Sequence, residues 1–280
     1  MSQTSNPLRQ FFRQPAVYIK LPSDGQFWPD KAISMTENRE LPVLPMTAID
    51  EITYRTPDAL FNGQAVISVI QSCIPAIKNA WDMPGMDTNA ILVAIRIASY
   101  GHAMPISSTC PACKTEQEYE IDLRSVLGSI QAPDYTYILT HGDLEIAFKP
   151  ASYQHQNTAN QLQFEEQRNI RSIPDSDMPD SEKIKKLNAA LSRITELTVD
   201  AMKFNIASIR TPQALVTDSD HIQEFLTNCD RKLFGQIRDR VIAFRLQSEL
   251  APIKLVCDNC ANEYDQGVNL DQTSFFEAAS

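Results

Sequence analysis

The feature that most constrains this 280-residue chain is a pair of Cys-x-x-Cys motifs that lie far apart in the sequence. Cys110-Pro-Ala-Cys113 and Cys257-Asp-Asn-Cys260 use four of the six cysteines. Two residues between thiolates let the backbone fold beneath a metal ion and place both sulfurs on one edge of a tetrahedron. Two such edges complete a closed four-thiolate site. We therefore expect one structural Zn²⁺ per chain, held by Cys110, Cys113, Cys257 and Cys260.

The segments around the two motifs resemble each other beyond the cysteines. Glu116 and Glu263 each follow the second cysteine of a motif by three residues, and Leu123 and Leu270 follow it by ten. Each segment predicts an apolar lead-in, a knuckle, a polar strand and a short helical turn, the last of these turns at 271–276. Two such hairpins that face each other form a zinc ribbon.

A thioredoxin-like redox pair, two separate disulfides and coincidence are the alternatives to a metal site. A redox pair begins a helix after a strand, whereas Lys114 and a strand-like segment follow Cys113. The N-terminal segment is polar and lacks the apolar core of a signal peptide, which favours reduced thiols and metal over disulfides.

Catalytic chemistry has no positive signal in the sequence. Four thiolates leave a zinc ion without the open position that a catalytic site needs. The four histidines are scattered, and no phosphate-binding glycine loop, nucleophile elbow or Ser/His/Asp set is present. We therefore predict that the chain is not an enzyme and has no catalytic or organic-cofactor residues.

Charge and hydropathy narrow the classes of partner. No apolar run approaches the 18 residues of a membrane span. The formal net charge of −10 repels phosphate backbones over the molecule as a whole. The alternative function is a zinc-ribbon module that binds nucleic acid through a basic helix at 231–245. Its basic residues are Arg231, Lys232, Arg238, Arg240 and Arg245.

The order of the segments predicts an α+β fold in four parts. Residues 1–105 form a small N-terminal α/β domain, β-rich at first and then helical. Residues 106–134 form the first zinc knuckle, and residues 135–250 form a β-hairpin followed by a helical region. Residues 251–280 form the second knuckle, which completes a four-cysteine zinc ribbon from two distant pieces.

A central helix is expected at 90–100, capped in the segment that begins at Asp87. Its surface is apolar except for Arg96. A buried arginine needs a carboxylate partner, for which Asp50 and Glu51 are candidates. The alternative is that the Arg96 side chain extends to solvent.

The helical region carries two further patterns. A stripe at 3–4–3 spacing predicts that a helix from 181 packs in a helical pair within this chain rather than in a free coiled coil; it consists of Ile184, Leu187, Leu191 and Ile194. The acidic loop at 174–180 and the basic helix at 231–245 are expected to pair within the molecule or between copies.

Three separated segments, in order, carry a family resemblance. Residues 21–29 resemble an opening Leu-Pro-Ser-x-Gly-x-Phe/Tyr signature, and residues 44–51 a Pro-Met-Thr-x-x-Asp-Glu segment. Residues 89–101, followed by the first cysteine motif, are similar to the most recognisable stretch of the same family. This is the baseplate hub protein family of T4-like contractile-tailed bacteriophages. The resemblance covers residues 17 to about 123 and, beyond them, only the second cysteine motif.

The resemblance implies a structural or assembly protein of the tail baseplate. It implies contacts with other baseplate hub, wedge or tail-tube proteins, in multiple copies around the tail axis. It also implies a location in the virion after assembly in the host cytoplasm, with no membrane partner. None of these expectations follows from composition or spacing.

Overall fold

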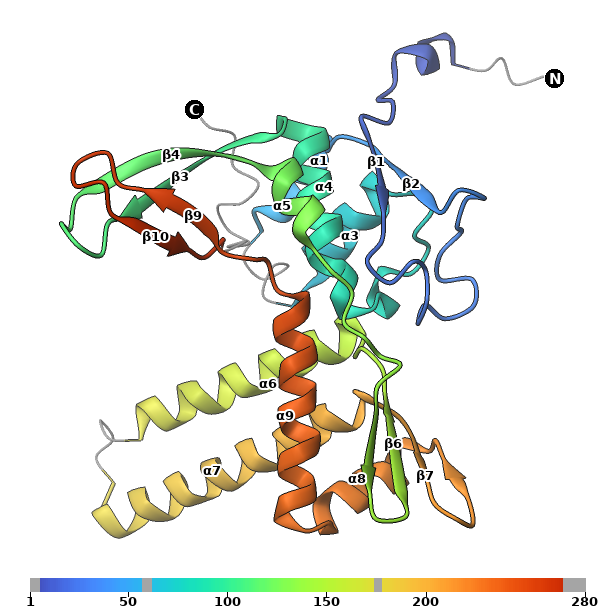
Figure 1. The fold of residues 1–280 in the computed structure, drawn as a ribbon, viewed down its shortest axis with the longest axis vertical. Coiled ribbons are helices and arrows are strands. Elements are labelled where there is room, and N and C mark those ends of the chain that lie inside the picture. The colour runs from blue at the N-terminus through green and yellow to red at the C-terminus, as the bar shows by residue number, and fades with distance from the viewer. Residues whose placement is uncertain (1–5, 57–61, 174–177, 269–280) are drawn as a thin grey trace.

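A computed structural model describes residues 6–56, 62–173 and 178–268 of the chain. Helices and small antiparallel sheets make up these residues, which confirms the predicted α+β class (Figure 1). Two hydrophobic cores organise them. The first core gathers buried side chains from 19 to 153, and the second gathers side chains from 139 to 244. No helix among the described residues is long and apolar enough to cross a bilayer.

The first core is built from a strand pair and three helices that precede the first cysteine motif. Strand β1 pairs antiparallel with β2, which agrees with the β-rich start expected of the N-terminal domain. Thr47 caps the next helix with a reciprocal bond to Asp50. The elements are η1 (Pro7–Phe11), β1 (Val17–Lys20), β2 (Glu40–Val43), α1 (Ala48–Tyr54), α3 (Gln64–Cys73), η2 (Ala80–Asp82), η3 (Gly85–Asp87) and α4 (Thr88–Tyr100).

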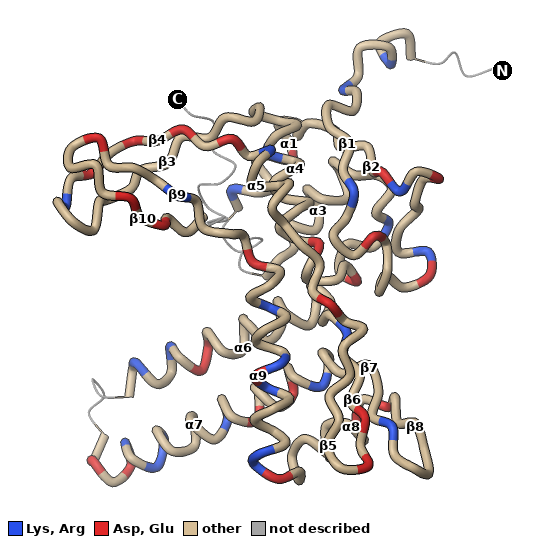
Figure 2. The backbone as a smooth tube through the Cα atoms, in the orientation of Figure 1, with Lys and Arg blue, Asp and Glu red and all other residues tan. Residues whose placement is uncertain are grey.

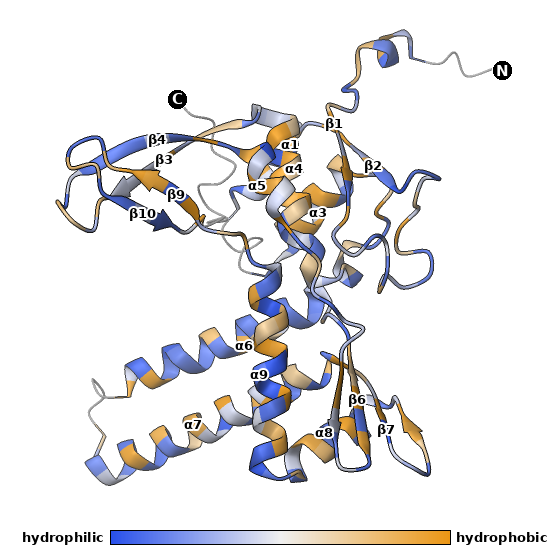
Figure 3. Ribbon diagram, in the orientation of Figure 1, coloured by the Kyte–Doolittle hydropathy of each residue, from blue (hydrophilic) through white to orange (hydrophobic). Residues whose placement is uncertain are grey.

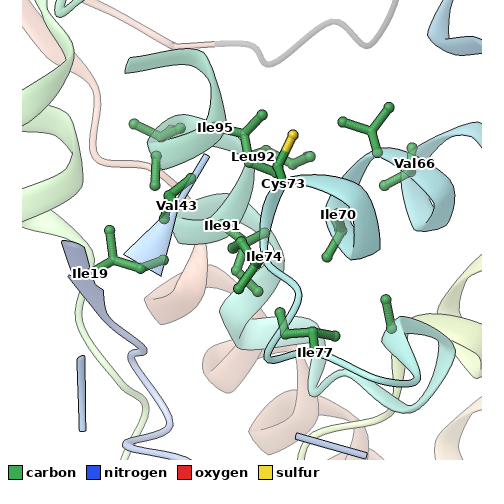
Figure 4. Close-up of a cluster of buried hydrophobic side chains, with 14 of the residues drawn as sticks. Ile19, Val43, Val66, Ile70, Cys73, Ile74, Ile77, Ile91, Leu92 and Ile95 are labelled. Atoms are coloured by element: carbon green, nitrogen blue, oxygen red, sulfur yellow. The ribbon is translucent and has the colours of Figure 1, made fainter. Parts of the chain in front are cut away.

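Helix α4 is the centre of this core, as the sequence predicts. Every residue from Ala90 to Arg96 is buried, and a helix that is apolar on all sides is stable only when other elements surround it. Side chains of α3 pack against it, among them Ile70, Cys73 and Ile74 (Figure 4). Burial raises the pKa of the Cys73 thiol to about 12, so this cysteine belongs to the core.

The surroundings of Arg96 differ from the sequence-based expectation. Its side chain is only 4% exposed, so the alternative that it extends to solvent is wrong. The guanidinium carbon lies 5.3 Å from the centre of the Tyr100 ring. Asp50 instead forms an ion pair of 3.2 Å with Arg13, and Glu51 accepts a hydrogen bond of 2.7 Å from the Tyr100 hydroxyl.

The second core lies between a four-stranded antiparallel sheet and helices that follow it. The hairpin expected at 135–149 is confirmed, and β7 adds to it in the order β5-β6-β7-β8. The elements are β5 (Ile138–His141), β6 (Leu144–Phe148), α6 (Tyr153–Ser172), α7 (Asp180–Lys203), β7 (Ile206–Arg210), β8 (Leu215–Val216), α8 (Ser219–Asn228) and α9 (Arg231–Ser248).

Helix α9 connects the second core to the C-terminal cysteine motif. Leu233, Ile237 and Phe244 are buried on its inner face. The tube of Figure 2 shows its basic residues along the helix, where Asp239 is the one acidic residue between Arg231 and Ser248. Arg238 and Arg245 form ion pairs with acidic neighbours on or just beyond the helix. The basic face is therefore partly neutralised within the chain.

Helices α6 and α7 form a hairpin that extends away from both cores (Figure 1). The predicted helical pair is present, but the predicted stripe does not form its contact. Ala190 and Leu197 are buried, whereas Ile184 and Leu191 are 59% and 49% exposed. Leu191 follows Ala190 by one residue, about 100° around the helix, so Ile184, Leu187 and Leu191 lie beside the contact and are exposed, while Ile194 is half-buried. Figure 3 shows hydrophobic positions along α7 between hydrophilic ones. Most of the acidic loop at 174–180 lies outside the described residues.

Candidate metal centre

Two β-hairpins carry the cysteine motifs at their turns. Strands β3 (Ala103–Thr109) and β4 (Glu116–Asp122) flank the first motif, and β9 (Ile253–Val256) and β10 (Glu263–Gln266) flank the second. The short helix α5 (Leu123–Ser129) follows β4, capped by the carboxylate of Asp122. The two hairpins lie against each other at one end of the molecule (Figure 1). The helical turn expected at 271–276 lies outside the described residues.

The two turns have the same backbone structure. In the first, the amide of Cys110 donates to the carbonyl of Thr115 at 3.0 Å, and the amide of Lys114 donates to the carbonyl of Cys110 at 2.9 Å. The second turn repeats both bonds around Cys257, at 3.0 and 2.8 Å. Lys114 and Ala261, which each follow the second cysteine of a motif, have positive φ angles of 61° and 54°. The repeat seen in the sequence is therefore also a repeat of conformation.

These turns bring all four cysteine sulfurs together. The Sγ atoms of Cys110 and Cys260 are 3.7 Å apart, and those of Cys113 and Cys257 are 3.6 Å apart. All four lie within 4.8 Å of one another. A tetrahedral zinc site with bonds of about 2.3 Å requires sulfurs about 3.8 Å apart, whereas a disulfide requires about 2.05 Å. The cysteines are free thiols, and their spacing is compatible with a metal site.

The sulfurs differ in their surroundings. Cys110 and Cys257 are buried, Cys113 is half-buried and Cys260 is exposed. Hydrogen bonds with the side chain and backbone of Thr115 lower the pKa of Cys113 to about 5. For Cys260 the backbone of Asn262 acts in the lowering direction, but hydrogen bonds with the neighbouring thiols, Cys113 first, outweigh it and raise the pKa to about 12. Crowded thiols cannot all ionise unless a cation compensates their charge, which is the situation that a bound metal resolves.

Tyrosines link the two hairpins beneath the sulfurs. The hydroxyl of Tyr264 donates to the Ser108 hydroxyl at 3.0 Å, and the hydroxyl of Tyr119 donates to the carbonyl of Val256 at 3.2 Å. The sequence analysis did not identify these residues. Each predicted strand after a cysteine motif contains a tyrosine, which could have indicated them. The two tyrosines stand at different distances from their cysteines, so they do not show up as part of the repeat.

The outer surface of the ribbon is acidic. Alternate residues of β4 point outward, as the period of a strand requires, and Glu116, Glu118 and Glu120 are all exposed. Glu263 and Asp265 bear the same charge along β10 (Figure 2). A surface of this sign beside the sulfurs repels phosphate groups.

A buried carboxylate links the signature segment at 21–29 to the central helix. Asp87 accepts hydrogen bonds from the amide and hydroxyl of Ser23, at 2.8 and 2.6 Å, and from the Trp28 indole at 2.8 Å. It occupies the cap position of α4 but makes no side-chain cap bond there, contrary to the simplest interpretation of the sequence. Burial raises the pKa of Asp87 to about 6 against these hydrogen bonds, which act to lower it.

A cavity of about 530 Å³ lies between α6, α7 and α9. Its single histidine, His155, stacks on Phe204 with ring centres 3.6 Å apart. The remaining wall mixes amide side chains such as Gln156 and Asn160 with apolar ones such as Met202 and Val241. Within the described residues, the cysteine cluster is the group of metal-ligating side chains close enough to share one ion.

Comparison with known proteins gives one family. The model of the family described as T4 bacteriophage base plate protein matches residues 16–277. No curated protein and no solved structure matches the chain. The matched span includes both cysteine motifs and also the helical middle region, where the sequence motifs showed no resemblance.

Proposed function

Because the chain belongs to the T4 bacteriophage base plate protein family, we propose that it is a structural subunit of the baseplate hub in a contractile phage tail. Family membership implies a structural role in the virion tail. The hub position, assembly in the host cytoplasm and the lack of catalytic activity are parts of the proposal. The match over nearly the whole chain is the observation that carries it.

We further propose that Cys110, Cys113, Cys257 and Cys260 bind one Zn²⁺ as a structural ion. Four sulfurs within 4.8 Å of one another, two pairs of them at 3.6 and 3.7 Å, support this assignment, since four thiolates select zinc or iron. When bound, the ion supplies cross-linking between the hairpins. The ligand pairs are separated by 143 residues, and closing so long a loop is entropically unfavourable without a strong bond. Binding energy at such a site is folding energy.

The division of the chain at 105, 134 and 250 is part of the same proposal. Two separate cores support it, with the region at 135–250 inserted between the two knuckles. Backbone bonds hold the start of this region to the first core, from Gly85 to Ala151 at 2.9 Å and from Tyr153 to Met83 at 2.7 Å. The zinc ribbon would hold its far end, beyond α9. A region fixed at both ends keeps its orientation when other subunits bind to it.

Other hub, wedge or tail-tube proteins are the proposed partners. Support comes from apolar side chains that the described residues leave exposed on the α6–α7 hairpin, including Phe164 at 52% and Ile184 at 59%. Ile184, Leu187 and Leu191 follow one another at 3–4 spacing along α7 and are all exposed, and a contiguous exposed apolar surface is typical of a protein–protein contact. The acidic ribbon and the partly neutralised α9 weigh against the nucleic-acid alternative.

The location is tested by fractionating tails and tail intermediates from infected cells and quantifying this chain by mass spectrometry. We expect it in the hub intermediate and in a fixed copy number per tail. Its presence only in free wedges would exclude the hub assignment. Binding of DNA that weakens steeply with salt would instead support the nucleic-acid alternative.

The metal is tested by elemental analysis of purified protein. We expect one zinc per chain, lost in Cys110→Ser and in Cys257→Ser. The matched control is Cys229→Ser, which removes a half-buried thiol outside the cluster and should keep the zinc. Stoichiometric iron would correct the identity of the ion. A metal-free protein whose four thiols react independently would exclude the site.

A further inference from the structure

The N-terminal arm, residues 6–12, projects from the molecule with its apolar side chains uncovered (Figure 1). It contains the short helix η1, which has no buried residue. Leu8, Phe11 and Phe12 are 60%, 75% and 56% exposed. Leu8 and Phe11 are three residues apart, so they lie on the same side of a 3₁₀ helix and form one ridge.

The base of this arm is firmly attached. The Arg13 guanidinium donates to the carbonyl of Pro45 at 2.6 Å, to the carboxylate of Asp50 at 3.2 Å and to the carbonyl of Ser72 at 2.8 Å. Three residues later, the Ala16 amide donates to the Val43 carbonyl at 3.0 Å. The arm therefore leaves the molecule from a fixed point, and its exposed ridge does not result from a loose attachment.

The chain has a second uncovered ridge, on α1. Ile49 and Ile52 are 75% and 69% exposed, whereas Asp50 and Tyr54 on the same helix are buried. The two isoleucines are also three residues apart and face outward together. Each ridge consists of large apolar side chains at the same sequence spacing, so the two match in size.

Charge favours contact between the two ridges. Within the arm, Arg9 is the one charged residue and it is basic, while the whole chain has a net charge of −10. Glu51 lies between the two exposed isoleucines in the sequence, as Arg9 lies between Leu8 and Phe11. A basic arm is thus attracted to an acidic molecule that bears an apolar ridge beside a glutamate.

We propose that the N-terminal arm of one copy docks on α1 of a second copy, with Leu8, Phe11 and Phe12 against Ile49 and Ile52. Each copy gives one arm and accepts one, which makes the contact head-to-tail, and contacts of this type generate rings or open chains. Two phenylalanine rings bury about 150–250 Å² each. This is less than the roughly 800 Å² per partner of a stable interface. The contact is therefore weak between free copies and gains strength where a common scaffold holds copies together.

Complementary variants test this arrangement in sedimentation velocity runs over a series of concentrations. We expect the average mass of the unaltered chain to rise with concentration. The arm variant (Phe11→Ser with Phe12→Ser) and the helix variant (Ile49→Ser with Ile52→Ser) should each stay monomeric. A mixture of the two should form heterodimers and nothing larger, because one intact arm and one intact α1 ridge remain.

Leu246→Ser is the matched control, since Leu246 is 57% exposed on α9 and should leave self-association unchanged. Thermal unfolding equal to that of the unaltered chain shows that each variant is folded. A monomeric unaltered chain, or a mixture that fails to form heterodimers, would overturn the proposal.

Cross-linking locates the contact independently of the zinc and hub proposals. A photoreactive benzoyl-phenylalanine replaces Phe11 in chains labelled with ¹⁴N or ¹⁵N, which are then mixed. We expect cross-linked peptides that join residue 11 to residues 48–55 and contain both isotopes. Cross-linked peptides that contain only one isotope would show contact within a single copy and would contradict the proposal. Cross-links from residue 11 to a surface other than residues 48–55 would contradict it as well.

Discussion

The ribbon and the first core show two different ways of stabilising a region of one chain. Around α4, the core surrounds a helix on all sides with apolar side chains. The ribbon consists of two hairpins that bury few apolar side chains, among them Ile121 and Leu255. Two-stranded hairpins are marginal by themselves, and small units commonly need a metal or a covalent staple. Under the zinc proposal, the four sulfurs and their ion replace a core that the ribbon lacks.

Removing the metal should produce the largest effect, and it should be confined to the ribbon. A zinc chelator, or Cys257→Ser, is expected to expose β9 and β10 to hydrogen exchange while the amides of α4 stay protected. Hydrogen exchange followed by mass spectrometry measures both regions in one experiment. Equal loss of protection in α4 would show that the ribbon and the first core unfold as one unit.

Deleting core volume should affect the whole molecule. Ile95 is fully buried in α4, so Ile95→Ala should lower the free energy of unfolding by about 2–5 kcal/mol. Val256→Ala in the ribbon is the control, because its side chain is 51% exposed, and it should change stability by less than about 1 kcal/mol. Urea denaturation gives both values. Similar losses in the two variants would contradict the distinction between the regions.

Breaking one ion pair in each region should also lower stability by different amounts. Arg13→Ala leaves the buried carboxylate of Asp50 without its cation, and we expect a loss of about 2–4 kcal/mol. Arg124→Ala breaks the exposed pair with Asp122 at the end of β4, where solvent screens the charges and little change is expected. Urea denaturation of the two variants tests this difference. A larger effect at Arg124 would reverse the predicted order.

A pH titration should give the smallest effect, again from the first core. Burial raises the pKa of Asp87 to about 6, above its ordinary value of 3.8. The folded state therefore holds this proton more tightly. The contribution is fully present below pH 3.8 and is lost as the pH rises through 6, with a total of at most about 3 kcal/mol.

Asp87→Asn should remove this part of the pH dependence. The measurement is the difference in free energy of unfolding between the unaltered chain and the variant at each pH. Other carboxylates cancel in that difference, including Asp50, whose pKa is lowered by hydrogen bonds with Thr47 despite its burial. A variant with the same pH dependence as the unaltered chain would show that Asp87 does not titrate in this range.

Local patterns in the sequence were sufficient for several elements. The helix predicted at 90–100 is present at Thr88–Tyr100, because a polar start, an apolar body and a terminal glycine all act over neighbouring residues. The hairpin was predicted at 135–149 from alternation and a turn, and its paired strands span 138–148. The two cysteine motifs were predicted to meet because their repeat implies that they bind one metal ion together. The Sγ atoms of Cys110 and Cys260 do lie close to each other.

Other features depended on residues that are distant in sequence. Asp87 has the identity and position of a helix cap, but its carboxylate binds Ser23 and Trp28, about 60 residues away. Asp50 pairs with Arg13 rather than with Arg96, because the chain before β1 lies beside α1. The stripe on α7 was assigned to the wrong contact, since spacing defines a face of a helix but does not say which neighbour covers it.

The sequence by itself determined the α+β class, the four cysteines that come together and the helix at the centre of the first core. These depend on residue type and on spacing along the chain, which short-range geometry converts directly into structure. Tertiary structure alone decided which carboxylate meets which cation, which side of α7 is covered, and that the arm and α1 each leave an apolar ridge open. These outcomes depend on how separate elements pack, and packing follows from the shape of the whole molecule.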